Sequence, residues 1–225
     1  MDKIEIFIET GKKKTFAGSI DWPGWIRWGK DEHSALASLG DYGKRYADVL
    51  NAAGIQFHPP EKVSSFSIVE RHKGNITTDF GAHDIVLKGD SRPVSQDEYL
   101  WTVRILQASW VVFDQAVDKS RGKELRKGPR GGGRDLEAIM QHVLEADWAY
   151  LRRLAWRVKK PGEVEISNQI HDSRTMILAA LDRAMKEGLP EKGPRGGKIW
   201  PVRFFIRRVT WHVLDHAWEI DDRLI

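Results

Sequence analysis

Three histidines in the second half of the chain have the residue type and spacing to bind a metal ion. His212 and His216 are four residues apart. On an α-helix this spacing separates two residues by about 6 Å along the axis and about 40° around it, so both imidazoles can reach one ion. His142 lies beside an apolar stripe in an earlier helical segment and can meet this pair if the two helices are neighbours. Three neutral imidazoles leave a fourth coordination position open, as metal-dependent catalysis requires.

The H-x-x-x-H spacing alone is weak support, because two such histidines are more often ordinary surface or core residues of a helix. Two features favour the metal site. His216 belongs to a stripe of apolar residues spaced three and four apart, so it occupies a core position. In addition, His142 and Trp148 frame the segment HVLEADW, which matches HVLDHAW between His212 and Trp218. We therefore predict a divalent-metal site for zinc, with nickel, iron or manganese as alternatives that ligand type cannot separate.

Three carboxylates share helix faces with the predicted ligands. Glu145, Asp215 and Glu219 each follow one of the histidines by three residues, which places them on the same face of the helix. We expect them to orient the ligands or to act as catalytic acids and bases. A surface salt bridge is the alternative for each of the three.

The elements that must position these residues are helices. Beyond residue 90 the sequence predicts four of them, at about 94–120, 134–157, 172–187 and 199–223. Glycine and proline separate the four segments, and helices of this length pack most simply as an antiparallel bundle. The bundle interior is then the place where the histidines meet.

An internal repeat relates the second of these helices to the fourth. The sequence KGPRGG occurs at 127–132 and again at 192–197, each time ahead of a helix that carries a histidine. The two helices are predicted to be structurally equivalent, although chance similarity between amphipathic helices is the alternative. We interpret the glycine-rich segments as connectors, with an anion site as the alternative. Neither segment ends in the lysine and hydroxyl residue of a nucleotide-binding P-loop.

The first half of the chain predicts a small sheet covered by one helix. A helix is expected at 31–53, with Asp31 as its N-cap and Gly54 at its end. The fold class is therefore α+β, with a domain at 1–90 and a four-helix bundle at 91–225. Strand patterns, bounded by turn residues, occur at 4–9, 15–20, 65–70 and 82–87.

Composition excludes several classes of protein and site. The chain has no cysteine, so disulfides, thiolate ligands and a cysteine nucleophile are excluded. No apolar run approaches the about 20 residues that span a bilayer, and the N-terminus does not have the pattern of a secretory signal. We expect a cytoplasmic protein without a membrane partner. Lys and Arg exceed Asp and Glu by only four, 36 against 32, so nucleic-acid binding is not expected; salt-dependent binding through 121–134 is the alternative.

The second half of the chain resembles the DinB-like family. The segment RVTWHVLDHAWEIDDR at 208–223 is similar to the closing helix of that family, and 139–154 is similar to an earlier helix with one histidine. The resemblance implies a four-helix bundle whose metal ligands are His142, His212 and His216. It also implies a homodimer and an activity on a small-molecule substrate, as a metal-dependent hydrolase or a transferase that uses a low-molecular-weight thiol.

The first half is similar to HicB-like domains, which are antitoxin folds with a short sheet and one helix. The similarity rests on FAGSIDWPGW at 16–25, followed by AL at 35–36 and RY at 45–46, and covers about residues 1–90. It implies that this half contacts a protein partner. A non-catalytic binding or regulatory protein, with the metal structural or absent, is therefore the competing hypothesis to an enzyme.

Overall fold

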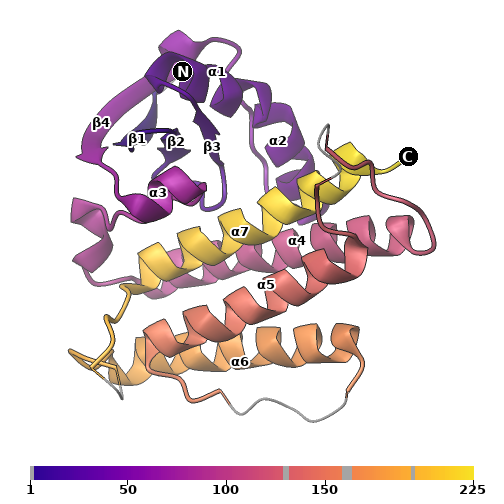
Figure 1. The fold of residues 1–225 in the computed structure, drawn as a ribbon. Helices are drawn as coiled ribbons and strands as arrows, with labels where there is room; N and C mark the ends of the chain where they lie inside the picture. Colours follow the sequence, from indigo (N-terminus) through magenta and orange to yellow (C-terminus); the bar gives the residue numbers. More distant parts are fainter. Residues whose placement is uncertain (1–2, 129–131, 159–163, 194–195) are drawn as a thin grey trace.

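The computed structural model describes residues 3–128, 132–158, 164–193 and 196–225 (Figure 1). The chain is α+β, with a four-stranded mixed sheet followed by four long helices, which confirms the predicted fold class. The sheet order is β3-β2-β1-β4, with β1 antiparallel to β2 and parallel to β4. The strands are β1 (Ile4–Thr10), β2 (Thr15–Ser19), β3 (Ile26–Gly29) and β4 (Phe66–Lys73).

The single helix expected at 31–53 was wrong, because two helices occupy this segment. They are α1 (Glu32–Asp41) and α2 (Gly43–Ala52), and Tyr42 between them ends the first and begins the second. Asp31 is the N-cap of α1, as predicted, and its side chain accepts a hydrogen bond from the backbone of Ser34. The break lets α1 pack on β2 and β3 while α2 contacts the bundle helix α4 (Gln96–Ser120).

The strand expected at 82–87 is also wrong, since this segment has no regular structure. In this segment the backbone N–H groups of Asp84 and Ile85 donate to the buried carboxylate of Glu9 and not to a neighbouring strand. The sequence reading missed two short elements, β3 and the five-residue helix α3 (Ile76–Phe80). Three further short turns are the 3-10 helices η1 (Val63–Ser65), η2 (Lys88–Ser91) and η3 (Arg152–Leu154).

The four predicted bundle helices are present, with shifted ends. They are α4, α5 (Leu136–Leu151), α6 (Ile166–Glu187) and α7 (Val202–Arg223). The second helix ends at Leu151 and continues only as η3, because Ala155 adopts a left-handed conformation with φ of 54°. The third begins six residues before the predicted 172, where the side chain of Glu165 accepts a hydrogen bond from Asn168 and caps the first turn.

The helices do not alternate in direction throughout the bundle. The pairs α4/α6 and α5/α7 are antiparallel, as expected. In α4/α6, Tyr99 contacts Asp182 and Asp114 contacts Arg174. In α5/α7, His142 contacts His212 and Tyr150 contacts Arg208. Within each of the other two pairs, α4/α7 and α5/α6, the helices are parallel. In α4/α7, Glu98 contacts Arg203 and Lys119 contacts Asp221. In α5/α6, Asp147 contacts Ser173, and Leu154 just after α5 contacts Arg183. The connection at 155–165 allows this order, because its 11 residues reach about 36 Å when extended, whereas a 16-residue helix is about 24 Å long.

The repeated glycine-rich segments share a backbone feature. Gly128 donates from its N–H to the carbonyl of Gly132 at 2.8 Å, and Gly193 donates to Gly197 at the same 2.8 Å. The two bonds occupy corresponding positions in the two copies of KGPRGG. The residues between them, 129–131 and 194–195, lie outside the described part. The shared bond supports the predicted equivalence of the helices that follow, α5 and α7.

The sheet half and the bundle share a core. Ile105 and Ala108 of α4, and Leu214 and Trp218 of α7, are buried among residues of the sheet, α1 and α2. The opposite faces of α4 and α7 pack in the core of the bundle. Figure 1 shows α7 lying between the sheet half and the other bundle helices. The helix that carries two of the histidines is therefore held from both sides, and the division into domains at residue 90 stays a prediction.

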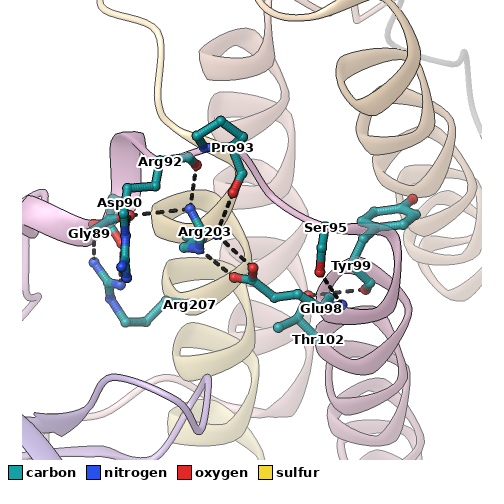
Figure 2. A network of polar contacts seen from close by, with 10 residues as sticks. All are labelled: Gly89, Asp90, Arg92, Pro93, Ser95, Glu98, Tyr99, Thr102, Arg203 and Arg207. Carbon is teal, nitrogen blue, oxygen red and sulfur yellow. Dashed lines mark hydrogen bonds and ion pairs between the residues drawn. The ribbon is translucent and has the colours of Figure 1, made fainter.

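Two arginines of α7 fix the link between the halves (Figure 2). Arg207 forms a two-pronged ion pair with Asp90, with N···O distances of 2.8 and 2.6 Å, and both side chains are 3% exposed. Arg203 pairs with the Glu98 carboxylate and donates to the backbone carbonyls of Gly89, Arg92 and Pro93. A cleft of about 850 Å³ opens beside this link, lined in part by both arginines and by Trp101. None of the described helices is long and apolar enough to cross a membrane.

Candidate metal centre

The three predicted ligands come together between α5 and α7. His142 lies on α5, where the neighbouring Ile139 and Val143 are buried in the bundle core, so its own side chain falls at the edge of that core and is half-buried. His212 and His216 lie one turn apart on α7 and are 6% and 7% exposed. The antiparallel packing of the two helices therefore brings residues 70 positions apart into contact.

The geometry of the cluster suits one ion. One ligand atom from each histidine can be chosen so that all three lie within 4.8 Å of one another. The Nε2 atoms of His142 and His212 are 3.3 Å apart, and the ring centroids of the three pairs are 4.6 to 5.2 Å apart. Bonds of about 2.0–2.1 Å to zinc place ligand atoms on a tetrahedron about 3.3 Å apart. Small side-chain adjustments are then sufficient to bind an ion.

The surroundings favour the neutral form of two of the three imidazoles, those of His142 and His212. Burial lowers the pKa of His142 to about 4, and the charges of His216 and Arg134 add to the effect. Burial also holds the pKa of His212 well below its ordinary value, assisted by His216, His142, Arg208 and Arg134. A neutral imidazole has a lone pair available for a metal, whereas imidazolium does not. His142 and His212 are thus ready to bind a divalent ion at neutral pH.

The hydrogen bonds of the rings indicate which nitrogen faces the ion. The Nδ1 atom of His216 lies 2.8 Å from Oε2 of Glu219, and because a carboxylate only accepts, this nitrogen donates and Nε2 is left for a metal. The Nδ1 atom of His212 is buried and has no hydrogen-bond partner within the described part of the chain. Its Nε2 atom faces His142. The residues present therefore fit a metal bound through Nε2 of His212 and His216.

Glu219 is the carboxylate that the structure brings to the cluster. Besides contacting His216, it accepts from Nη1 of Arg223 at 2.5 Å. The hydrogen bond from His216 lowers the pKa of the Glu219 carboxyl, and Arg223 lowers it further. An ionised carboxylate behind a metal-binding imidazole fixes the ring and raises its basicity. Glu219 is in position for this orienting role.

The other two predicted carboxylates lie elsewhere. Glu145 is exposed on α5 and accepts from Nε2 of Gln141 at 2.9 Å, although its charge is close enough to raise the pKa of His142. Asp215 forms an ion pair with Arg27 of β3 at 2.7 Å, on the side of α7 that faces the sheet. Asp215 is therefore not brought to the histidine cluster. Catalytic roles for Glu145, Asp215 and Glu219 stay predictions.

Several residues around the centre were missed by sequence reasoning. Arg223 reaches back from α7 to the carbonyls of Arg126 and Arg134, at 3.0 and 2.6 Å, and so ties the connector before α5 to Glu219. Arg208 lies next to Tyr150, whose hydroxyl accepts from its Nε at 3.3 Å, and the Tyr150 ring is 5.6 Å from that of His212. The four-residue spacing of 208, 212 and 216, followed by 219 and 223, was a usable signal. The spacing alone does not single out these residues, because arginines on a helix are usually solvated.

Comparisons of the chain with protein-family models, with curated proteins and with solved structures give no significant match. The DinB-like and HicB-like resemblances therefore stay predictions. What stands without them is a buried cluster of three histidines within a helical bundle.

Proposed function

We propose that this protein is a metal-dependent hydrolase, or a transferase that uses a low-molecular-weight thiol, of the DinB-like type and acting on a small molecule. One observation carries the proposal: three imidazoles from two helices have ligand atoms within 4.8 Å of one another. An active centre needs such a set with one position left open, whereas structural zinc sites are closed by a fourth protein ligand. Zinc is the proposed ion, with nickel, iron and manganese as alternatives.

The chemistry divides between the ion and the protein. When bound, a divalent ion supplies Lewis acidity to a water or thiol in its open position. The protein's own residues hold the geometry: Glu219 fixes the His216 ring, and Arg223 fixes Glu219. Burial of His212 and His216 excludes water from the inner side of the centre. The Tyr150 ring lies 5.6 Å from the His212 ring, and its hydroxyl accepts a hydrogen bond from Arg208.

Elemental analysis of the purified protein tests this proposal. We expect about one divalent ion per chain in the wild type, and loss of stoichiometric metal in His216→Ala because three ligands are the minimum for such a centre. His171→Ala is the matched control, since His171 is exposed on α6. Full metal retention in His216→Ala, or a wild type that binds no divalent ion when reconstituted, would overturn the proposal. Assay of the loaded protein with and without added thiol then separates a transferase from a hydrolase.

A non-catalytic binding or regulatory protein is the second candidate, favoured by one feature of the sheet half. Ile76 and Phe80 on α3 are 71% and 82% exposed, and large apolar side chains exposed one turn apart are typical of a protein contact. We propose that a protein partner docks there if the metal is structural or absent. Pull-down of a small basic toxin-like protein, weakened by Phe80→Asp, would support this candidate; unchanged capture by the variant would contradict it.

A further inference from the structure

The cleft between the sheet half and the bundle is a large cavity separate from the histidines. Its volume of about 850 Å³ falls in the range of small-molecule sites, about 300–1,000 Å³, and such sites are common where two parts of a chain meet. The wall on α7 includes Arg203 and Arg207, whose side chains reach to α4 and η2. His212 instead faces His142 on α5. The cleft and the histidines therefore lie on different sides of α7.

The two arginines in this wall carry no free charge into the cleft. Arg207 is paired with Asp90 and Arg203 with Glu98, so a carboxylate offsets each positive charge. Figure 2 shows both pairs, with Arg203 also bonded to backbone carbonyls that precede α4. This wall is fixed in place and close to neutral. Other side chains therefore decide which ligand charge the cleft favours.

The remaining lining has an excess of free carboxylates. Its acidic side chains are Glu5, Asp21, Glu70, Asp90, Asp97 and Glu98, and its basic ones are Lys88, Arg92, Arg203 and Arg207. Three of the acidic groups already have a partner. The side chains of the other three, Glu5, Asp21 and Asp97, form no ion pair or hydrogen bond with the described residues. The lining is thus net negative, although the whole chain has a formal charge of +4.

The free carboxylates reach the cleft beside one aromatic ring, that of Trp101. Asp97 precedes Trp101 by four residues on α4, so both lie on one face of the helix. The Trp101 ring meets the Trp22 ring edge to face at 5.4 Å, and Asp21 is the chain neighbour of Trp22. The carbonyl of Glu5 accepts a hydrogen bond from the residue before Asp21. Negative charge therefore enters the cleft from the sheet half and from α4, next to a half-buried indole.

The cleft also contains uncovered apolar surface. Its apolar lining residues are Ile20, Pro23, Val69, Leu87 and Trp101. Val69 is 43% exposed although it belongs to strand β4. An ammonium group is attracted both by carboxylates and by the face of an indole, and an apolar body removes the aliphatic surface from water. The lining thus matches an organic cation better than a metal ion, which would leave the apolar surface unused.

We infer that this cleft binds a small molecule with an ammonium group on an apolar body, and that the ammonium group lies near Asp97, Asp21 and the Trp101 ring. Lys88 and Arg92, at the two ends of η2, line the same cleft and form no ion pair with a described residue. They can accept a carboxylate on the ligand and would repel a second ammonium group. The ligand is therefore a primary amine or an apolar amino acid, which share the ammonium group.

Titration calorimetry with phenethylamine, phenylalanine and hydrocinnamate tests the cleft, in about 0.15 M salt so that long-range attraction is screened. The three probes share the phenyl ring and differ only in their charged groups. We expect saturable binding of about one phenethylamine or phenylalanine per chain, because each has an ammonium group. Hydrocinnamate has only the carboxylate and should not bind. Tighter binding of phenylalanine than of phenethylamine would identify an amino-acid site, and the reverse order an amine site.

Two variants locate the binding. Asp97→Asn should weaken it about tenfold, because the amide loses the charge of one charge-assisted hydrogen bond. Asp118→Asn is the matched control, since Asp118 lies at the other end of α4, is 71% exposed and pairs with Arg121. Trp101→Leu keeps an apolar side chain and removes the indole face, so it should also weaken binding. Asp97 lies in the first turn of α4, where a carboxylate stabilises a helix, so circular dichroism checks that each variant is folded.

The outcomes separate the cleft from the metal centre. Absence of saturable binding, equal binding of hydrocinnamate and phenethylamine, or equal affinities in Asp97→Asn and Asp118→Asn overturns the inference. If Trp101→Leu fails to fold, the exposed Asp97 decides the question alone. Metal content in Asp97→Asn should equal that of the wild type, because the histidines lie on the other side of α7. Asp97-dependent amine binding by a protein that takes up no divalent ion supports the cleft site and removes the proposed function.

Discussion

Arg27 of β3 and Asp215 of α7 form an ion pair with 2.7 Å between Nη1 and Oδ1. The Arg27 guanidinium also lies 3.8 Å from the centre of the Tyr42 ring, at the break between α1 and α2. This contact fastens the sheet to the helix that carries two of the histidines, on the side away from the metal centre. The observed contact of Asp215, three residues after His212, thus joins α7 to the sheet.

Asp215→Asn is expected to destabilise the protein without affecting metal content. Removing the charge leaves a mostly buried Arg27 without its partner, and partial solvent exposure of Asp215 limits the cost to about 1 kcal/mol. Chemical denaturation measures the change in the free energy of unfolding, and elemental analysis measures the metal. Loss of metal at unchanged stability would instead make Asp215 part of the functional centre.

Glu219→Gln is expected to weaken metal binding by about 10- to 100-fold, since the amide carries no charge to strengthen His216 as a ligand. The visible spectrum of the cobalt-substituted protein should change as well, because the His216 ring loses its fixed orientation. Competition with a chromophoric chelator measures the affinity. Glu187→Gln serves as the control, because Glu187 is exposed at the end of α6. Equal affinities in the two variants would show that Glu219 does not support the ligand.

Asp147 makes stability depend on pH. Burial raises the pKa of its carboxyl from 3.8 to about 7, against the lowering effects of Ser173 and Arg174. The folded state therefore favours the protonated form. The resulting stabilisation is fully present below about pH 4 and is lost as the pH rises through about 7. Asn stays neutral throughout, so Asp147→Asn should be more stable than the wild type at pH 8, by at most about 4 kcal/mol, and close to it at pH 4.5. Denaturation at both pH values checks this, and parallel profiles for the two proteins would contradict it.

The buried pair of Arg207 and Asp90 should be far more sensitive to substitution than an exposed one. Asp90→Asn leaves a guanidinium uncompensated in the interior, which costs about 3–5 kcal/mol of unfolding free energy. Asp222→Asn is the comparison, because the Arg45–Asp222 pair is 32% and 51% exposed and such pairs contribute about 0–1 kcal/mol. Similar losses in the two variants, measured by urea denaturation, would mean that Asp90 contributes little to the link between the halves.

The helices and the ligands were predictable because each depends on local periodicity. An apolar stripe repeated over six turns identifies α7, and the place of His216 in that stripe indicated an inward-facing side chain. The echo of HVLE in HVLD pointed to His142 as the third ligand. Antiparallel contact between α5 and α7 then follows from the bundle and brings the three side chains together.

The features that sequence missed depend on contacts between distant residues. The segment at 82–87 has a strand-like composition, yet its N–H groups are taken by Glu9, a partner 75 positions away. The break at Tyr42 falls within an apolar stripe that continues into the second helix; Gly40 and Gly43 flank the break, and α1 packs against the sheet while α2 packs against α4. Arg208 resembles any helix-surface arginine until its burial is known. Periodicity carries no information about such partners.

The repeat that relates α5 to α7 also explains why the cluster has three histidines and not four. Four residues after His212 comes His216, whereas four residues after His142 comes Ala146. A perfectly twofold arrangement would surround the ion with four imidazoles, as in a storage or scaffold site, and leave no room for a reactant. Ala146 on α5 would therefore leave one side of a bound ion accessible, and we expect Ala146→His to hold metal more tightly and to abolish the proposed turnover.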